Sequence, residues 1–345
     1  MRKKIVKVCR YTLFTLLGII VVFLIFPTWT PRIEGENSIS RLERMVVNGE
    51  KHEVMIRGMD LTNPVLLFVH GGPGYSEIPY VRKYQRELEQ HFTIVHYDQR
   101  GSGKSFHFQG DYSNLTTDVL VEDLIAITKQ ITEKLHQEQV ILVGHSFGTY
   151  IGMKAAAQAP ELFQAYIGIG QMADTIQSEV ETLEYTMQKA SAAGNTADVR
   201  KLELLRESIE RGEGLTPRTY VQKYGGSARL INENLDYVTG FLFNSEYNGL
   251  DVIRFYAGIL QSQDRLVGES LDNPLPEVVD ETRIPTYFLM GQYDYMTTLN
   301  AASDYLDTLK APEKELVVFQ QSAHYPQFEE KERFAAWLVE HFKSN

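Results

Sequence analysis

The stretch Val140-Ile-Leu-Val-Gly-His-Ser-Phe-Gly-Thr149 decides the fold. Four apolar residues run directly into Gly144-His-Ser-Phe-Gly148, and an alanine-rich, helix-favouring segment follows to about Ala159. This order predicts a strand, a tight turn and a helix, the context in which G-x-S-x-G carries chemistry. Glycines permit the sharp turn, and Ser146 would lie at the positive end of the helix. Ser146 is therefore the candidate nucleophile; the alternative is a turn whose serine does no chemistry.

Strand and helix patterns alternate on both sides of this stretch. Continuous apolar runs typical of doubly buried strands occur before and after it, and the stripe of Leu120, Leu124, Ile127, Ile131 and Leu135 predicts an amphipathic helix between them. Asn48-Gly49 within residues 41–59 predicts a hairpin. This alternation predicts an α/β fold with a mostly parallel, doubly wound sheet. The expected strands are 65–69, 92–97, 140–143 and 165–169, and a helix is expected at about 78–90.

The character of the chain changes after residue 170. Hydrophilic helical segments dominate residues 171–282, with breaks at glycines and Pro217 and no buried-strand pattern. Strand patterns return at 284–290 and 315–319, and residues 328–342 predict a closing amphipathic helix. We therefore expect an α/β core in two parts, residues 31–170 and 283–345, interrupted by a helical cap at 171–282.

The N-terminus has the pattern of a membrane anchor. An apolar run over residues 11–26, extended to Trp29, is about 19 residues or roughly 28 Å as a helix, enough to cross a bilayer. Pro27-Thr-Trp-Thr-Pro31 offers no signal-peptidase site, and a buried core helix fits poorly with the flanking cations. Residues 1–30 therefore predict a cytoplasmic basic start and one uncleaved transmembrane helix, with residues 30–39 as a polar tether. The lipid bilayer is an expected partner through residues 11–29, and the catalytic domain is expected outside the cytoplasm. The basic residues ahead of the run are Arg2, Lys3, Lys4, Lys7 and Arg10.

Charge and cysteine content exclude several classes of function. The 345 residues carry a formal net charge of -11, and without the five N-terminal cations 29 basic residues face 45 acidic ones. Nucleic acid is therefore not an expected partner. Cys9 is the only cysteine, so the chain has no intrachain disulfide and no cysteine-based zinc site.

Two further residues complete a candidate catalytic triad. A serine hydroxyl needs a base within hydrogen-bond reach, and a carboxylate to orient that base. On this fold the partners follow in the order Ser, Asp or Glu, His, each after a strand. Asp294 follows the predicted strand at 284–290, and His324 follows the one at 315–319. We expect His324 to be the base for Ser146 and Asp294 to be the acid that orients it. Asp304 and Asp307 are weaker candidates for the acid because they fall on a predicted helix. The other histidines near predicted elements do not lie in the loop after the last predicted strand, as the base should: His70, His96, His145 and His341.

Glycines after the strand at 65–69 predict an oxyanion hole. His70-Gly-Gly-Pro-Gly74 lets a backbone N–H approach the substrate, and we assign the hole to the N–H groups of Gly72 and Phe147. Asp98-Gln-Arg-Gly-Ser-Gly-Lys-Ser105 lacks the spacing of a P-loop, which excludes nucleotide binding by that motif. Its expected role is structural, with Asp98 and Arg100 bracing the loops around the site.

These motifs together resemble a known family. HGGPG at 70–74, DQRGSGKS at 98–105 and GHSFG at 144–148 resemble the α/β-hydrolase superfamily, and within it the proline iminopeptidase branch of serine peptidases. The resemblance covers about residues 45–342 and implies Ser146, Asp294 and His324 as triad and Gly72 with Phe147 as oxyanion hole.

The chain departs from that branch at several positions. His145 and Phe147 flank the serine where GGSWG is typical, a proline is missing after Asp294, and His324 stands between alanine and tyrosine. The branch also uses acidic cap residues to hold the substrate's amino terminus, but no motif transfers that role to Glu203, Glu207 or Glu246.

The expected function is a membrane-anchored serine hydrolase that forms an acyl-enzyme and needs no metal or organic cofactor. An aminopeptidase of proline iminopeptidase type and a small-ester hydrolase with the same triad both remain open, so the expected substrate is a small ester or a short peptide. A catalytically silent receptor is the alternative from another class, because fold alone does not exclude it. The oligomeric state has no signature in the sequence.

Overall fold

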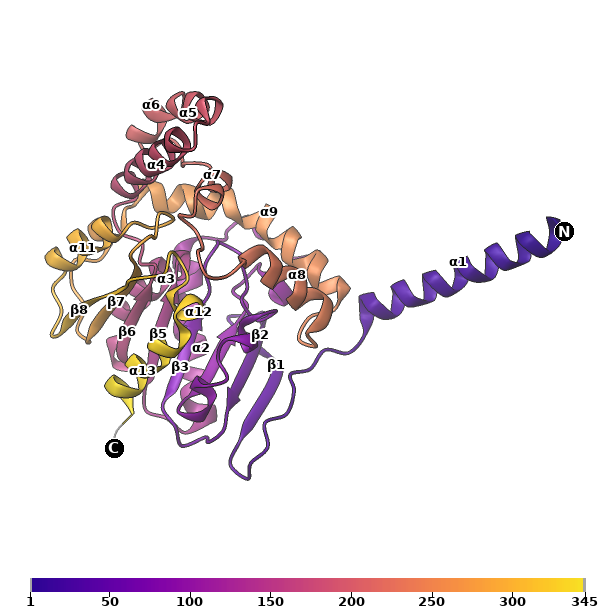
Figure 1. Cartoon of the computed structure of the whole chain (residues 1–345). Helices are drawn as coiled ribbons and strands as arrows, with labels where there is room; N and C mark the ends of the chain where they lie inside the picture. Colours follow the sequence, from indigo (N-terminus) through magenta and orange to yellow (C-terminus); the bar gives the residue numbers. More distant parts are fainter. Residues whose placement is uncertain (1, 344–345) are drawn as a thin grey trace.

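A single mixed sheet forms the centre of the molecule. The computed structural model describes the backbone of residues 2–343, and the side chains of these residues except 2, 3, 5, 6 and 8, so those of Arg2 and Lys3 in the predicted basic start lie outside the described residues. In this described part, eight strands join in the order β1-β2-β4-β3-β5-β6-β7-β8 (Figure 1). The strands are β1 Ile39–Val47, β2 Glu50–Gly58, β3 Val65–Val69, β4 Thr93–Tyr97, β5 Val140–His145, β6 Phe163–Ile169, β7 Thr286–Gly291 and β8 Lys314–Phe319.

The sheet is parallel except at one edge. β1 pairs with β2, and β2 with β4, in antiparallel fashion, whereas the remaining neighbours pair in parallel. Asn48 and Gly49 have φ of 49° and 83°, as a two-residue turn needs, which confirms the predicted hairpin. The mostly parallel sheet is also confirmed. Parallel strands place their carboxyl ends at one edge, where the catalytic loops are expected.

Helices cover both faces of the sheet because its central strands are apolar on both. In β3, Leu67 packs on the side of α2, α3 and α11, whereas Leu66 packs on the side of α13. The predicted stripe of α2 lies in the first of these two clusters. The bounds are α2 Thr117–Leu135, α3 Phe147–Gln158, α11 Leu299–Thr308, α12 Pro326–Glu329 and α13 Lys331–Phe342.

The segment between β6 and β7 lies over the carboxyl ends of the strands (Figure 1). It is helical, as its composition predicts, and in the described structure it contains no named strand. Its helices are α4 Thr175–Ala192, α5 Thr196–Glu203, α6 Arg206–Glu210, α7 Arg218–Lys223, α8 Glu233–Phe243, α9 Gly249–Asp272 and α10 Leu275–Val278.

The helix predicted at 78–90 is wrong. Only two short 3₁₀ turns form there, Val81–Lys83 and Leu88–Gln90. Gln85 and Glu89 are buried and bond to the sheet: Gln85 Oε1 lies 2.9 Å from His96 Nε2, and Arg57 Nε donates to Glu89 Oε1 at 2.6 Å. These long-range contacts hold the segment in place of helical hydrogen bonds.

The predicted transmembrane helix over residues 11–29 is not supported. Helix α1 spans Arg2–Ile25, and in the described part of the chain no helix meets the length and apolarity needed to cross a membrane. The apolar helical part stops at Ile25, ahead of Pro27, because the residue before a proline disfavours helical geometry.

The polar tether predicted at residues 30–39 is wrong in its first part. Thr30 and Ile33 are buried, and strand β1 already begins at Ile39. Arg57 Nη1 donates to Thr30 Oγ1 at 2.6 Å and to the Pro31 carbonyl at 2.7 Å. The chain after α1 is therefore packed against the folded domain.

Candidate active site

Ser146 occupies a strained turn between β5 and α3. Its φ of 54° and ψ of -125° lie outside the regions that non-glycine residues favour. Strain of this kind persists only where the surroundings hold it. Here the Ser146 N–H donates to the Ile169 carbonyl at 2.9 Å, and the Ser146 carbonyl accepts from Thr149 N at 2.8 Å. The turn therefore presents the hydroxyl at the end of the sheet, as the G-x-S-x-G pattern predicts.

The two glycines of the pattern are required by space. A Cβ on Gly144 would lie 2.7 Å from the Gly148 carbonyl oxygen and 2.8 Å from Thr149 Cα. A Cβ on Gly148 would overlap the carbonyl oxygen of Val69 at the end of β3. Close packing of strand and helix at the turn thus depends on hydrogen at both positions.

Asp294 and His324 form a buried hydrogen-bonded pair. Asp294 follows β7 and His324 follows β8, each 2% exposed, and His324 Nδ1 donates to Asp294 Oδ2 at 2.8 Å. The Asp294 carboxylate also accepts from Met296 N at 2.9 Å, from Thr297 N at 3.0 Å and from Thr297 Oγ1 at 3.1 Å. These bonds fix the carboxylate and the imidazole in one orientation.

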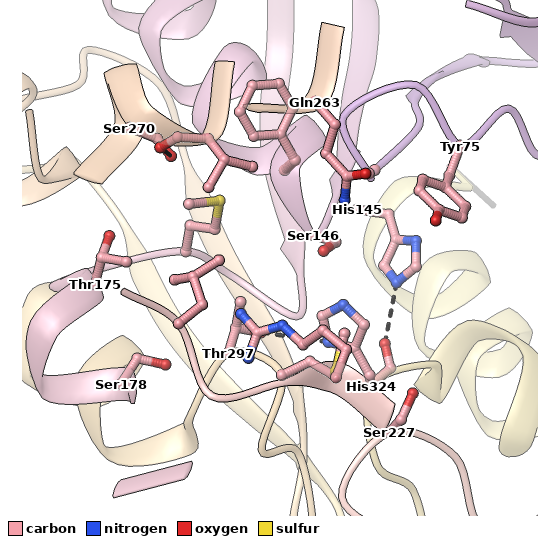
Figure 2. Close-up of a pocket in the computed structure, with 18 of the residues that line it drawn as sticks. Tyr75, His145, Ser146, Thr175, Ser178, Ser227, Gln263, Ser270, Thr297 and His324 are labelled. Carbon is pink, nitrogen blue, oxygen red and sulfur yellow. Dashed lines mark hydrogen bonds between the residues drawn. The ribbon is translucent and has the colours of Figure 1, made fainter. Parts of the chain in front are cut away.

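His324 Nε2 faces the pocket that contains Ser146. Nε2 is buried and, among the described residues, has no hydrogen-bond partner. Ser146, Phe147, Gly72 and His324 all line one cavity of about 230 Å³ between the sheet and the cap (Figure 2). Because Nδ1 carries the proton donated to Asp294, Nε2 of the neutral ring is the free base. The arrangement suits proton transfer from a serine hydroxyl.

The predicted oxyanion residues border the same space. Gly72 has φ of 120°, and Phe147 is the first residue of α3, whose N–H lacks an acceptor within the helix. Gly71 lies still closer to Ser146, since a Cβ there would stand 2.8 Å from Ser146 Cβ. The glycines after β3 thus leave room for a substrate carbonyl beside Ser146.

Gly170 has a site role that sequence reasoning missed. It directly follows β6 and has φ of 54°. A Cβ at this position would lie 2.8 Å from both Cε1 and Nδ1 of His324 and 3.2 Å from Asp294 Oδ2. The signal was available, because Gly170 directly follows the strand predicted at 165–169. Glycine at this position lets the Asp294–His324 pair lie against the end of β6.

His145 is the second residue that sequence reasoning missed. Its Nδ1 donates to Glu77 Oε1 at 2.6 Å, and its Nε2 donates to the His324 carbonyl at 3.0 Å (Figure 2). Both partners are acceptors, so both bonds require the doubly protonated ring. Burial opposes that charge, but the Glu77 carboxylate outweighs it and raises the pKa of His145. Burial likewise raises the pKa of Glu77, and His145 outweighs it to give a lowered pKa.

The loop DQRGSGKS ties neighbouring loops together, as predicted for Asp98. The Asp98 carboxylate accepts hydrogen bonds from Lys104 N at 2.7 Å, from Ser76 Oγ and from Tyr247 of the cap. Burial raises the pKa of Asp98 to about 7, against the effect of these donors. Arg100 instead binds Asp123 of α2 through two bonds of 2.7 Å.

The HGGPG loop is bound to the same segment. Gln99 N donates to His70 Nε2 at 3.1 Å, and Gln99 Nε2 donates to the His70 carbonyl at 2.6 Å. His70 Nδ1 donates to the Gly71 carbonyl at 2.9 Å, and burial lowers the pKa of His70 to about 4. His70 is thus a neutral structural residue that holds the glycines beside Ser146.

The cap glutamates singled out from the sequence do not line the pocket. Glu203 and Glu207 pair with Arg206 and Arg211 on the outer surface, and buried Glu246 pairs with Arg82 at 2.8 Å. A different cap carboxylate, Glu179 of α4, borders the cavity. Its carboxylate accepts from Arg218 Nη2 at 2.5 Å and from Thr216 N at 2.8 Å.

Comparison with known proteins agrees with this architecture. The chain is 31% identical over 316 residues to a probable aminopeptidase of Bacillus subtilis, YbaC, covering 90% of this chain and 98% of the relative. It is 24% identical to a proline iminopeptidase of Saccharolobus solfataricus, over 81% of this chain and 84% of that one. The crystal structure of the Mycobacterium smegmatis proline iminopeptidase superposes with a TM-score of 0.62 at 16% identity, over 87% of this chain and 97% of the other.

A family model described as the alpha/beta hydrolase fold matches residues 64–331, which include β3 to β8, the cap and the loops that carry Ser146, Asp294 and His324. The predicted α/β-hydrolase fold with a mostly parallel sheet is confirmed, without its transmembrane helix, and so is the resemblance to the proline iminopeptidase branch. The chain belongs to the α/β-hydrolase family and is a hydrolase.

Proposed function

We propose that the protein is a serine hydrolase in which Ser146 is the nucleophile, His324 the general base and Asp294 the residue that orients His324. The observation that carries this proposal is the free, buried Nε2 of His324 in the cavity that Ser146 lines, with Nδ1 held by Asp294 at 2.8 Å. A positioned base of this kind is what a serine hydroxyl needs to attack a carbonyl.

The proposed reaction has two halves. Ser146 Oγ attacks the substrate's acyl carbon while His324 Nε2 takes the hydroxyl proton, and the oxyanion accepts bonds from the N–H groups of Gly72 and Phe147. His324 then gives the proton to the leaving amine or alcohol, which leaves an acyl ester on Ser146. Water, deprotonated by His324, attacks that ester, and His324 returns the proton to Ser146 Oγ as the acid is released.

The first substrate class we propose is a short peptide with a free amino terminus, in particular an N-terminal proline. Its support is the likeness to aminopeptidases and the HGGPG and DQRGSGKS motifs, together with a cavity of about 230 Å³ that admits only a small group. The cap helices close this cavity from above, so a chain end enters more readily than a chain interior.

A small ester is the second substrate class, and one observation favours it. Both glutamates that line the described cavity already have a basic partner, Glu77 with His145 and Glu179 with Arg218. An ammonium group at the substrate's end would have to compete with these partners, whereas an ester makes no such demand.

The deciding experiment compares kcat/KM on a prolyl arylamide and on a short-chain p-nitrophenyl ester, with the Ser146→Ala variant beside the wild type. Preference for the amide, lost in the variant, supports the aminopeptidase. Cleavage of the ester alone, lost in the variant, supports the esterase. Activity that survives Ser146→Ala contradicts Ser146 as the nucleophile. Absence of both activities and of serine-probe labelling contradicts the serine hydrolase and favours the catalytically silent receptor.

We also propose that α1 attaches the domain to a cell membrane. The helix extends away from the folded body (Figure 1), and its apolar side chains from Leu13 to Ile25 include many that are more than half exposed. Apolar groups on all sides of an exposed helix favour contact with lipid. Fractionation of cells that make the full chain tests attachment, and proteolysis of intact cells tests the expected position outside the cytoplasm. Recovery of the full chain in the soluble fraction would contradict the proposal.

A further inference from the structure

Two cap helices expose large apolar side chains that the proposed chemistry does not use. On α8, Leu242 and Phe243 are 55% and 80% exposed, and on α9 Leu260 is 85% exposed. Soluble domains rarely expose large apolar side chains in such a group. The cap apolar face consists of Leu235, Val238, Leu242 and Phe243 of α8 and Ile253, Tyr256 and Leu260 of α9.

The spacing of these residues places them on one side of each helix. Leu235, Val238 and Leu242 recur at intervals of three and four, and Ile253, Tyr256 and Leu260 do the same. The inner sides of the two helices are used for folding, since Phe241, Phe255 and Ile259 lie in the core beneath the cap. The outer apolar side is therefore surplus to the packing of the described domain.

Two carboxylates of these helices are turned away from the apolar face. Asp236 of α8 and Asp251 of α9 are buried and paired with Lys83 and Arg254, at 2.6 Å and 2.7 Å. The exposed Asp264, four residues after Leu260, ends the apolar row of α9. The apolar rows themselves carry no charge and can enter a low-dielectric medium at little electrostatic cost.

The end of α1 is bound at the edge of the same face. Asn248 Nδ2 donates to the Phe26 carbonyl at 2.9 Å, and Trp29 N donates to the Ser245 carbonyl at 3.0 Å. Lys104 Nζ donates to Thr28 Oγ1 at 2.8 Å. These bonds hold the residues that directly follow α1, so the helix leaves the domain between the end of α8 and the start of α9 (Figure 1).

We infer that the cap apolar face docks on the surface of a lipid bilayer, beside the point where α1 enters it. Trp29, 56% exposed, follows α1 in the chain and is bound through its N–H to the Ser245 carbonyl between α8 and α9, and indole rings favour the membrane–water interface. With α1 in lipid, its bound end brings α8 and α9 to the same membrane. The inference rests on the attachment of α1 but not on the chemistry of Ser146.

Docking would bring the pocket wall to the membrane. Tyr237 of α8 and Gln263 and Val267 of α9 line the cavity, on the same helices that carry the cap apolar face. The helices that contact lipid are thus also the helices that bound the substrate's space.

The test uses the full chain with Cys9→Ser, so that a single new cysteine carries an environment-sensitive fluorophore. Leu242→Cys and Leu260→Cys report on the cap apolar face, Leu16→Cys reports on α1, and Glu332→Cys on α13 is the control, with a side chain that is 73% exposed. Each labelled protein is mixed with vesicles of phosphatidylcholine and phosphatidylglycerol. Circular dichroism and thermal unfolding, measured on every variant, show that the fold is intact.

The expected result is a blue shift and quenching by lipid-borne quenchers at positions 242, 260 and 16, with no change at 332. A change at 16 alone would overturn the docking face and leave the attachment of α1 standing. No change at any position would overturn both, independently of hydrolysis. A shift at 242 and 260 that needs no vesicles and grows with protein concentration would assign the face to a second copy, against this inference.

Replacement of the face gives an independent readout. The double variant Leu242→Asp with Leu260→Asp is tested by flotation of the full chain with vesicles. Its vesicle partition coefficient is expected to be roughly tenfold lower than that of the wild type. Val46→Asp, at a residue 59% exposed on β1, is the matched control and is expected to leave flotation unchanged. Equal flotation of the pair and the control would contradict docking.

Discussion

The loops at the strand ends are packed tightly, whereas the cap helices contain open space and exposed apolar side chains. At the strand ends, hydrogen bonds fix Asp294 and the Nδ1 side of His324, and glycines have no room for a Cβ, as at Gly148 against Val69. In the cap, α9 contains Gly268 with open space around it, and its outer side exposes Leu260. We call the strand-end loops the floor of the site and the cap helices its roof. The comparison indicates that the floor tolerates almost no substitution, whereas the roof tolerates more. Substitutions matched between the two regions test this difference.

The largest difference is expected between two serines that line the same cavity. Ser146→Ala at the strand end removes the nucleophile and is expected to lower kcat on the order of 10⁵-fold. Ser270→Ala in α9 removes only a hydroxyl that donates to the Val267 carbonyl at 2.8 Å, so kcat should stay within about threefold. Steady-state kinetics on the preferred substrate measure both. Comparable losses would show that the roof takes part in chemistry.

Asp294→Asn is expected to have the next largest effect. The amide cannot accept the Nδ1 proton in the same way, so His324 loses its tautomer and kcat should fall about 10⁴-fold with little change in KM. Asp307→Asn, at an exposed position on α11, is the control and should leave kcat unchanged. A loss below tenfold for Asp294→Asn would assign the orienting role to another group.

Gly148→Ala tests the floor by space rather than by chemistry. Its Cβ would meet the Val69 carbonyl oxygen, so backbone must move, and the free energy of unfolding should fall by about 5 kcal/mol. Chemical denaturation measures the change. A variant of wild-type stability would mean that β3 and α3 separate without cost, contrary to the described packing.

Glu77→Gln removes the partner of a buried charge and should cost about 3 kcal/mol. Glu77 raises the pKa of His145, so the pair stabilises the fold while His145 is protonated, and this contribution disappears as the pH rises through the raised pKa. The lowered pKa of Glu77 sets the acid limit, since stability falls as the pH drops through it. The difference in melting temperature between wild type and variant should therefore shrink from near neutral pH to about pH 9.

If that difference were the same at both pH values, the second proton of His145 would not be part of the folded state. The control is Gln139→Glu, which changes the charge at an exposed position near β6 without touching the Glu77–His145 pair.

The smallest effect is expected at Gly268 in the roof. A Cβ there meets nothing within 4 Å, and alanine favours a helix interior, so Gly268→Ala should raise the free energy of unfolding by roughly 0.5–1 kcal/mol. Thermal and chemical denaturation check the sign. Destabilisation at this position would show that the roof is packed as tightly as the floor.

Much of the core was predictable because its signals are local. Residues 65–69 and 140–143 are apolar on both faces, which is how β3 and β5 read as central strands, and Asn48-Gly49 specifies a two-residue turn. The same locality placed Ser146, Asp294 and His324 after their strands. The 78–90 helix was mispredicted because Gln85 and Glu89 obtain their partners from residues distant in sequence.

The remaining features depend on distance in space. Nothing in the sequence around His145 shows that Glu77, 68 residues earlier, accepts its proton, or that the His324 carbonyl lies on its other side. Gly170 is ordinary until the Asp294–His324 pair is seen against it. The exposed rows of α8 and α9 likewise look amphipathic in sequence, with no sign of which side is buried.

The amino-acid order alone specified the strands, the hairpin, the sharp turn at Ser146 and the helical nature of the cap, because these follow from periodicity and from the freedom of glycine. The tertiary structure decided which charges are paired, where α1 leaves the domain, and which apolar sides are left uncovered. Those properties arise when residues far apart in the chain compete for the same buried space, and no short stretch of sequence records the outcome.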